Sequence, residues 1–144
     1  MLTNLIGNAI VQAGRAIKIH NIKLFLENNF NVTPEQFIVL NTLCEHENLY
    51  QKELCDLLLK DKSNMTRILS VLCDKDLIQK IPTKDKKIVN KIQITKKGRE
   101  VRDLIAPFMQ MSRKKYLDDI NEDELYVCLR VLSKIKSNLE NNKE

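Results

Sequence analysis

Basic residues are concentrated in one short segment of this 144-residue sequence, whose formal net charge is +5. Positions 80–102 hold nine Lys and Arg residues and only two acidic ones, whereas the rest of the chain sums to −2. Side chains of this kind neutralise phosphate groups. A surplus confined to one segment therefore indicates a surface that binds a polyanion, rather than a uniformly basic protein.

A second group of polar side chains lies just ahead of this segment, at the start of a predicted helix. Asp61 is a suitable N-cap, and Ile68, Leu69 and Leu72 give the helix an apolar stripe. A short amphipathic helix over 51–60 precedes it, so the two match a helix-turn-helix, in which the second helix contacts base edges in the major groove. Many helical proteins contain such a pair, so this signal is weak by itself. The candidate base-contacting residues are Lys62, Ser63, Asn64, Thr66 and Arg67.

Two predicted strands follow, over 78–81 and 88–94. In the second, isoleucines alternate with Lys91 and Gln93, which is typical of a half-exposed antiparallel pair. A hairpin directly after a helix-turn-helix forms a wing that can reach the phosphate backbone. Solvated surface lysines are the alternative, but the charge surplus beside the candidate reading helix favours the wing. Its turn carries Lys84, Asp85, Lys86 and Lys87.

The rest of the chain is predicted to be helical. Apolar residues recur at helical spacing over 2–28, 34–45 and 122–140, and Thr33-Pro34 with Gln36 is a strong helix start. A helix beginning after Thr95 extends to about Tyr116, and Pro107 inside it predicts a kink or a break. With three Gly and three Pro, the chain has little material for an all-β fold.

Other classes of protein find little support. No apolar run approaches the roughly 20 residues of a membrane span, and no targeting signal is evident, so the expected location is the cytoplasm. The sequence has no paired carboxylates, no nucleophile beside a base and no Gly-rich phosphate loop, so no enzyme is expected. The sequence has only two His and four widely spaced Cys, without metal-ligand spacing, so neither a metal nor a cofactor is expected. Reduced cysteines are expected, two or three of them in buried gaps, and a redox role for Cys44, Cys55, Cys73 or Cys128 is left open.

Several short motifs occur in a recognisable order. They are Val32-Thr33-Pro34-Glu35-Gln36-Phe37 with Val39-Leu40, Glu53-Leu54, Asp61-Lys62-Ser63, Thr66-Arg67, Leu77-Ile78, Asp85, and Ile94-Thr95 followed by Gly98. In this order and spacing, the chain resembles the MarR family of transcriptional regulators over nearly its full length.

The resemblance implies a mainly α fold with a small antiparallel β-hairpin wing. It implies one domain over 1–144, with a winged helix-turn-helix lobe at 33–98 and long dimerisation helices at 1–30 and 99–144. A homodimer would bind a near-palindromic operator in double-stranded DNA, as a ligand-responsive repressor. A winged-helix module that binds protein instead of DNA is the alternative.

The resemblance also implies a small aromatic or phenolic effector, held between the dimer helices and the DNA-binding lobe. Arg15, His20, Met109 and Tyr116 are the candidate lining residues. The sequence departs from the family at four points. Lys87 and Asp76 stand where the family usually has Arg and Gly, the wing is one residue longer than usual between Asp85 and Thr95, and the first helix lacks the reactive Cys of redox-sensing members.

Overall fold

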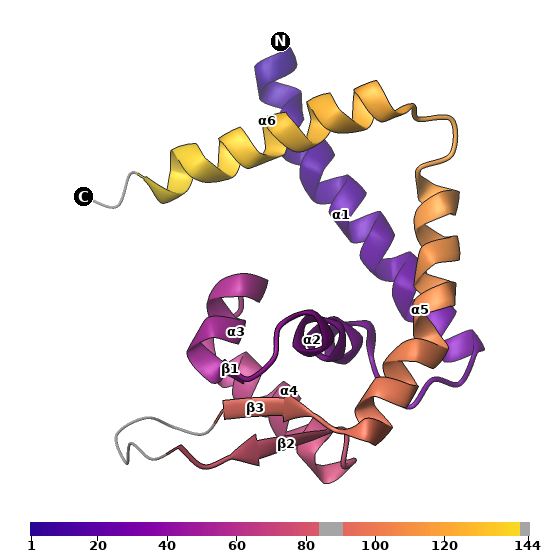
Figure 1. Cartoon of the computed structure of the whole chain (residues 1–144). Helices are drawn as coiled ribbons and strands as arrows, with labels where there is room; N and C mark the ends of the chain where they lie inside the picture. The colour runs from indigo at the N-terminus through magenta and orange to yellow at the C-terminus, as the bar shows by residue number, and fades with distance from the viewer. Residues whose placement is uncertain (84–90, 142–144) are drawn as a thin grey trace. The chain divides into compact units, whose positions relative to one another are not determined.

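Helices and a few short strands make up the computed structural model, which describes residues 1–83 and 91–141 (Figure 1). The helices are α1 (Leu2–Glu27), α2 (Pro34–Glu45), α3 (Gln51–Leu58), α4 (Lys62–Asp74), α5 (Lys96–Tyr116) and α6 (Glu122–Glu140). The strands are β1 (Leu49–Tyr50), β2 (Ile78–Ile81) and β3 (Lys91–Ile94). The chain divides into two units, Met1–Gln110 and Met111–Glu144, so the predicted helix-turn-helix and sheet lie within the first unit. The prediction of a mainly helical winged-helix fold is confirmed.

Side-chain caps fix the starts of three helices where the sequence predicted them. Thr33 Oγ1 accepts from the Gln36 N–H at 3.2 Å, and Gln36 Oε1 accepts from the Thr33 N–H at 3.1 Å. Asp61 Oδ1 accepts from the Asn64 N–H at 2.7 Å, and Asn121 Oδ1 accepts from Glu124 at 2.9 Å. These bonds satisfy amides that have no partner within their own helix, so each helix begins at a defined residue.

The sheet has three antiparallel strands in the order β1-β3-β2 among the residues described. The predicted β2–β3 hairpin is present, with Ile78 opposite Ile94. The sequence analysis missed β1, because a strand of two residues is too short to show alternation. Its pairing, Tyr50 opposite Lys91, matters because β1 runs directly into α3. The sheet therefore fixes where the helix-turn-helix begins.

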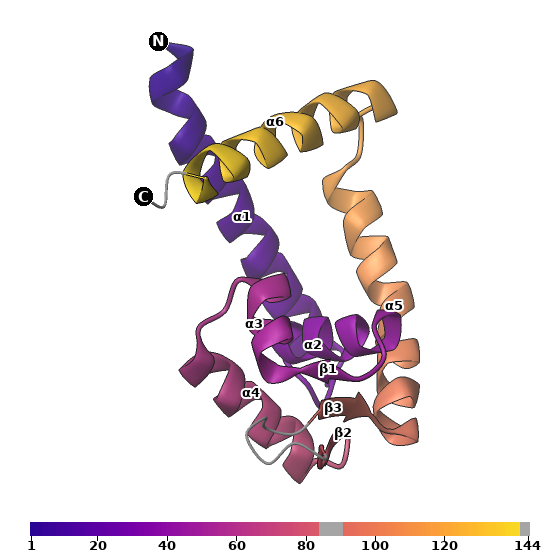
Figure 2. The ribbon, with the colours of Figure 1, turned by 60° about the vertical axis from the view of Figure 1, so that its left-hand side comes forward.

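The core of the first unit lies among α2, α3, α4 and the sheet, which pack together in both ribbon views (Figures 1 and 2). Ile68, Leu69 and Leu72 form the predicted buried stripe of α4. The most deeply buried side chains are Val39, Leu40, Leu43, Leu54, Met65, Leu69, Leu72, Leu77, Ile92 and Ile105. Burying large aliphatic side chains stabilises a fold by about 1.5–3 kcal/mol each, so this core holds the helix-turn-helix rigidly against the sheet.

The end of α4 shows why the family usually has Gly at position 76. The Leu77 N–H donates to the Leu72 carbonyl at 3.0 Å, and the Asp76 N–H donates to the Cys73 carbonyl at 2.9 Å. This hydrogen-bond pattern is a Schellman motif, which places Asp76 in the left-handed region at φ 59°. Aspartate adopts this conformation at a cost that glycine avoids.

The start of α5 is locked onto the end of α4. Thr95 Oγ1 accepts from the Gly98 N–H at 3.0 Å and donates to the Asp76 carbonyl at 2.6 Å. A Cβ at position 98 would lie 2.1 Å from the Leu77 carbonyl oxygen, so this close approach requires glycine.

Pro107 does not interrupt α5, so of the predicted kink or break near this residue, the break does not occur. Proline removes one backbone hydrogen bond, but packing on both sides of it holds the helix. Ile105 is buried, and the ring of Phe108 lies 5.0 Å from that of Phe30 in an edge-to-face contact. Across the described part of the chain, no helix has the length and apolar character needed to cross a membrane.

Candidate nucleic-acid interface

The turn between α3 and α4 sets the direction of the candidate reading helix. Leu59 takes a left-handed conformation with φ 50°, and the Lys60 N–H donates to the Cys55 carbonyl at 3.1 Å, which ends α3. Asp61 then caps α4. Only a short turn separates the helices, so α4 has little freedom to move relative to α3.

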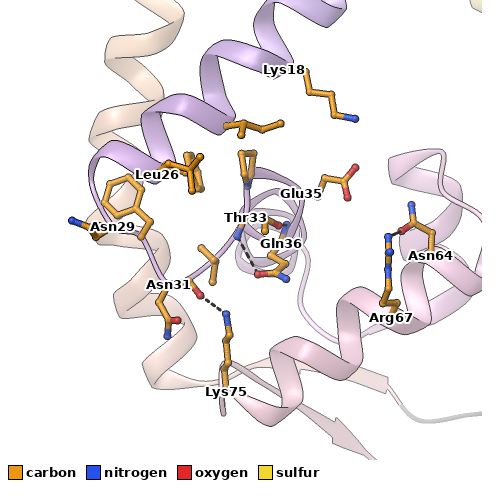
Figure 3. A pocket seen from close by; sticks show the side chains of 15 residues that line it. Lys18, Leu26, Asn29, Asn31, Thr33, Glu35, Gln36, Asn64, Arg67 and Lys75 are labelled. Carbon is orange, nitrogen blue, oxygen red and sulfur yellow. Dashed lines mark hydrogen bonds between the residues drawn. The ribbon is translucent and has the colours of Figure 1, made fainter.

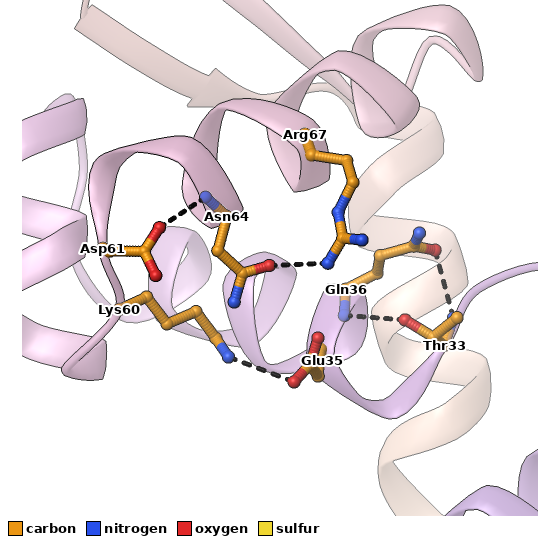
Figure 4. A network of polar contacts seen from close by, with 7 residues as sticks. All are labelled: Thr33, Glu35, Gln36, Lys60, Asp61, Asn64 and Arg67. Atoms are coloured by element: carbon orange, nitrogen blue, oxygen red, sulfur yellow. Dashed lines mark hydrogen bonds and ion pairs between the residues drawn. The ribbon is translucent and has the colours of Figure 1, made fainter.

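A polar network ties this turn to α2 (Figure 4). Lys60 Nζ lies 3.3 Å from Glu35 Oε1, and the Lys60 side chain is only 17% exposed. One turn into α4, Arg67 Nη2 donates to Asn64 Oδ1 at 2.8 Å. Asn64 is itself held through its backbone by the Asp61 cap. The guanidinium group of Arg67 is therefore oriented before any ligand or nucleic acid is bound.

The other predicted base-contacting residues share the first two turns of α4. Lys62, Ser63 and Thr66 are exposed with Arg67, whereas Asn64 is half-buried. All five lie on one exposed helix start, as a reading helix requires. The predicted wing residues Lys84, Asp85, Lys86 and Lys87 lie outside the described residues.

One polar partner of this helix was missed by the sequence analysis. Gln51, the first residue of α3, donates from Nε2 to Thr66 Oγ1 at 2.7 Å. The two residues are 15 positions apart, and no periodicity links them. The only signal in the sequence was a polar residue at the start of the helix that precedes the reading helix.

A hollow of about 880 Å³ lies beside the reading helix, between the end of α1, the start of α2 and α4 (Figure 3). Phe25, Phe30, Val32 and Ile22 supply apolar lining. Lys18, Arg67 and Lys75 supply positive charge, and the acidic lining residue, Glu35, is already paired with Lys60. The hollow therefore suits a small molecule with an apolar body and a negative charge.

The four residues predicted to line an effector site lie elsewhere. Arg15 is exposed and His20 half-buried on α1, Met109 is half-buried on α5, and Tyr116 belongs to the second unit. None of the four lines the hollow.

The cysteines are all free, and three of them are half-buried against or near the core, as expected for fillers of small gaps. Cys128 is exposed. Burial, with smaller contributions from Asp56 and Asp61, raises the pKa of the Cys55 thiol, which disfavours the reactive thiolate. The residues described contain no group of three His, Cys, Asp or Glu side chains placed to hold a metal ion.

Comparison with known proteins agrees with this geometry. Residues 30–87 match the model of the MarR family. An uncharacterised HTH-type transcriptional regulator of Bacillus subtilis, YybA, is 23% identical over 116 residues, which cover 81% of this chain and 77% of that protein.

Two solved structures have the same fold. A MarR variant from E. coli, complexed with operator DNA, superposes with a TM-score of 0.81 at 20% identity, covering 90% of this chain and 92% of that one. Staphylococcus aureus MarR, in complex with salicylate and kanamycin, has a TM-score of 0.82 at 18% identity, and the match covers 99% of this chain and 95% of that one.

The matching proteins are regulators rather than enzymes, which confirms the prediction that this chain has no enzymatic activity. The winged helix-turn-helix fold and the family match over residues 30–87 point in the same direction. The chain is similar to the MarR family of transcriptional regulators in this segment and shares their fold.

Proposed function

We propose that this regulator is a homodimer that represses transcription by binding a near-palindromic operator, and that a small ligand releases it. The observation that carries the proposal is the start of α4, where Lys62, Ser63, Thr66 and Arg67 are exposed on a helix capped by Asp61. Such an arrangement can enter a major groove without reorganisation.

The contacts divide into two kinds. Asn64, Thr66 and Arg67 provide base-edge recognition, because side chains of these types match the hydrogen-bonding and apolar groups that bases present in the major groove. Lys62, Ser63 and the wing residues Lys84, Lys86 and Lys87 position the protein on the phosphate backbone, and Asp85 belongs to the same wing turn. The lysines displace counterions, so affinity falls steeply as salt concentration rises.

Exposed apolar side chains on the terminal helices support the dimer. None of the described residues of α6 is buried, although Tyr126 is 70% and Leu129 65% exposed. On α1, Leu5 and Val11 are also more than 60% exposed. Apolar surface of this extent marks an interface, and a second copy of the chain is the partner that a two-fold operator requires. The operator-bound E. coli relative supports the same mode of binding.

The effector is a small aromatic or phenolic compound, in line with the salicylate complex of the S. aureus relative. The hollow beside α4 has the lining for such a ligand, and it shares Asn64 and Arg67 with the reading helix. Arg15, His20, Met109 and Tyr116 remain a second proposed location, between the dimer helices and the lobe.

The decisive experiment is selection of bound sites from random duplex DNA with the purified protein. We expect a near-palindrome whose half-sites are about one helical turn apart. Selection of a single unpaired half-site would contradict the dimeric mode. Absence of salt-dependent binding to random duplex at low salt would instead favour a module that binds protein.

A further inference from the structure

The Thr66 hydroxyl is already engaged within the protein. It donates to the Lys62 carbonyl at 2.8 Å and accepts from Gln51 Nε2 at 2.7 Å. A threonine hydroxyl has one proton and two acceptor lone pairs, so its donor and one acceptor position are occupied. Both bonds lie near the 2.7–2.8 Å optimum for hydroxyl groups, and together they fix the χ1 angle of Thr66.

Fixing the hydroxyl also fixes the other group on Cβ, the methyl. Thr66 is exposed within the second turn of the proposed reading helix. A hydroxyl bonded to its own helix and to α3 has no proton to donate to a base. The groups left to Thr66 are one acceptor lone pair of the hydroxyl and the methyl, and of these the methyl is the one that can recognise the thymine 5-methyl group.

We propose that Gln51 is a positioning residue for base recognition, and that it makes Thr66 a reader of the thymine 5-methyl group. In the major groove, the 5-methyl group distinguishes thymine from the other bases, and a threonine methyl packs well against it. This inference rests on the proposed function of α4 as the reading helix. It adds Gln51, which contacts Thr66 rather than the base, to the residues that determine specificity.

The placement of Gln51 explains how one side chain can have this effect. It follows directly on β1, whose Tyr50 pairs with Lys91 of β3. At the same junction, Glu53 Oε2 accepts from the Tyr50 N–H at 3.4 Å. The sheet thus anchors the first residue of α3, and the Gln51 amide transmits that position to Thr66.

The test uses a duplex obtained by selection, in which each thymine in turn is replaced by deoxyuridine. This replacement removes the 5-methyl group and keeps the base pair and the O4 acceptor. For the wild-type protein, we expect one position per half-site at which the deoxyuridine replacement weakens binding about fourfold. This is the change expected for the loss of one buried methyl-sized group. Equal affinity for thymine and uracil at every position would overturn the proposal.

Substitutions at position 66 separate the methyl from the hydroxyl. Thr66→Ser keeps the hydroxyl and loses the methyl, so it should bind the thymine duplex and the deoxyuridine duplex equally. Thr66→Val loses the hydroxyl but keeps a methyl group, and valine in a helix strongly prefers one χ1 rotamer without any hydrogen bond, so it should retain the thymine preference. The reverse pattern would show that the hydroxyl is the reading group and would overturn the proposal.

Gln51→Ala removes one of the two hydrogen bonds that fix the Thr66 hydroxyl and leaves the bond to the Lys62 carbonyl, so the thymine-to-uracil ratio should fall. Gln79→Ala is the matched control, because Gln79 also donates a side-chain hydrogen bond, to Gln93 at 2.8 Å on the sheet, and should leave the ratio unchanged. A Gln51→Ala protein with the wild-type ratio would overturn the positioning role.

NMR couplings that report the Thr66 χ1 angle give a measurement without DNA: one rotamer is expected in the wild type and averaging in Gln51→Ala. Failure of every selection would overturn the proposed function itself, whereas selection of a site without a methyl-sensitive position overturns this inference alone.

Discussion

Arg67 and Asn64 form a hydrogen-bonded pair on the first turns of α4, with 2.8 Å between Nη2 and Oδ1. The pair holds a guanidinium fork in a defined direction, and Arg67 also lines the adjacent hollow. A planar donor held in this way loses less side-chain entropy on binding, so the pair is prepared for base recognition.

We expect Arg67→Ala to weaken binding to the selected operator by about 10–100-fold, the range for one good base contact. Binding to random duplex should change much less. Arg67→Lys keeps the charge without the planar guanidinium fork. It should therefore recover only the non-specific part of the DNA affinity, not the preference for the selected operator. Fluorescence anisotropy with both duplexes measures the two effects, and an equal loss on both would assign Arg67 to phosphate contact.

Lys87→Ala should weaken binding to all duplexes alike and lower the slope of log affinity against log salt by about one unit, because one phosphate contact is lost. Lys134→Ala, a change at a lysine of α6, is the control and should leave the slope unchanged. A changed operator preference in Lys87→Ala would show that the wing reads sequence.

Leu129→Glu should convert the dimer to monomers at micromolar concentration, because it places a charge in the proposed apolar interface. Lys134→Glu, at an exposed polar position of the same helix, should remain dimeric. Sedimentation equilibrium measures both, and a dimeric Leu129→Glu protein would place the interface elsewhere.

Lys18→Ala should weaken binding of salicylate, used as the probe, by about tenfold, because the hollow loses one of its cations. His20→Ala should bind the probe like the wild type, since His20 does not line the hollow. Isothermal titration calorimetry compares the two. The opposite ranking would place the effector at the site proposed from Arg15, His20, Met109 and Tyr116.

Asp76→Gly should stabilise the protein by about 0.5–1 kcal/mol, because glycine adopts φ 59° without steric cost. Asp74→Gly changes the last residue of α4, where the backbone is helical, and should destabilise it by a similar amount. Urea denaturation at fixed protein concentration gives both values. A destabilised Asp76→Gly protein would mean that the Asp76 side chain contributes more than its backbone strain costs.

Local signals in the sequence were sufficient for most element boundaries. Thr33 and Asp61 each cap the helix that the sequence assigned to them, because a cap depends on residues within one turn. The left-handed Asp76 agrees with the family resemblance, in which Gly usually occupies this position. The break predicted at Pro107 failed, since tertiary packing of Ile105 and Phe108 offset the lost hydrogen bond.

The sequence by itself therefore determined the helices and the two longer strands, where the basic charge lies, and which family the chain resembles. Only the tertiary structure decided which distant residues meet. Gln51 contacts Thr66, Lys60 contacts Glu35, and Lys18 joins Arg67 around one hollow. These contacts depend on how α1, α2, α3 and the two-residue strand β1 pack around α4. Packing of this kind is set by side-chain shape over the whole core, and it leaves no periodic signal in the sequence.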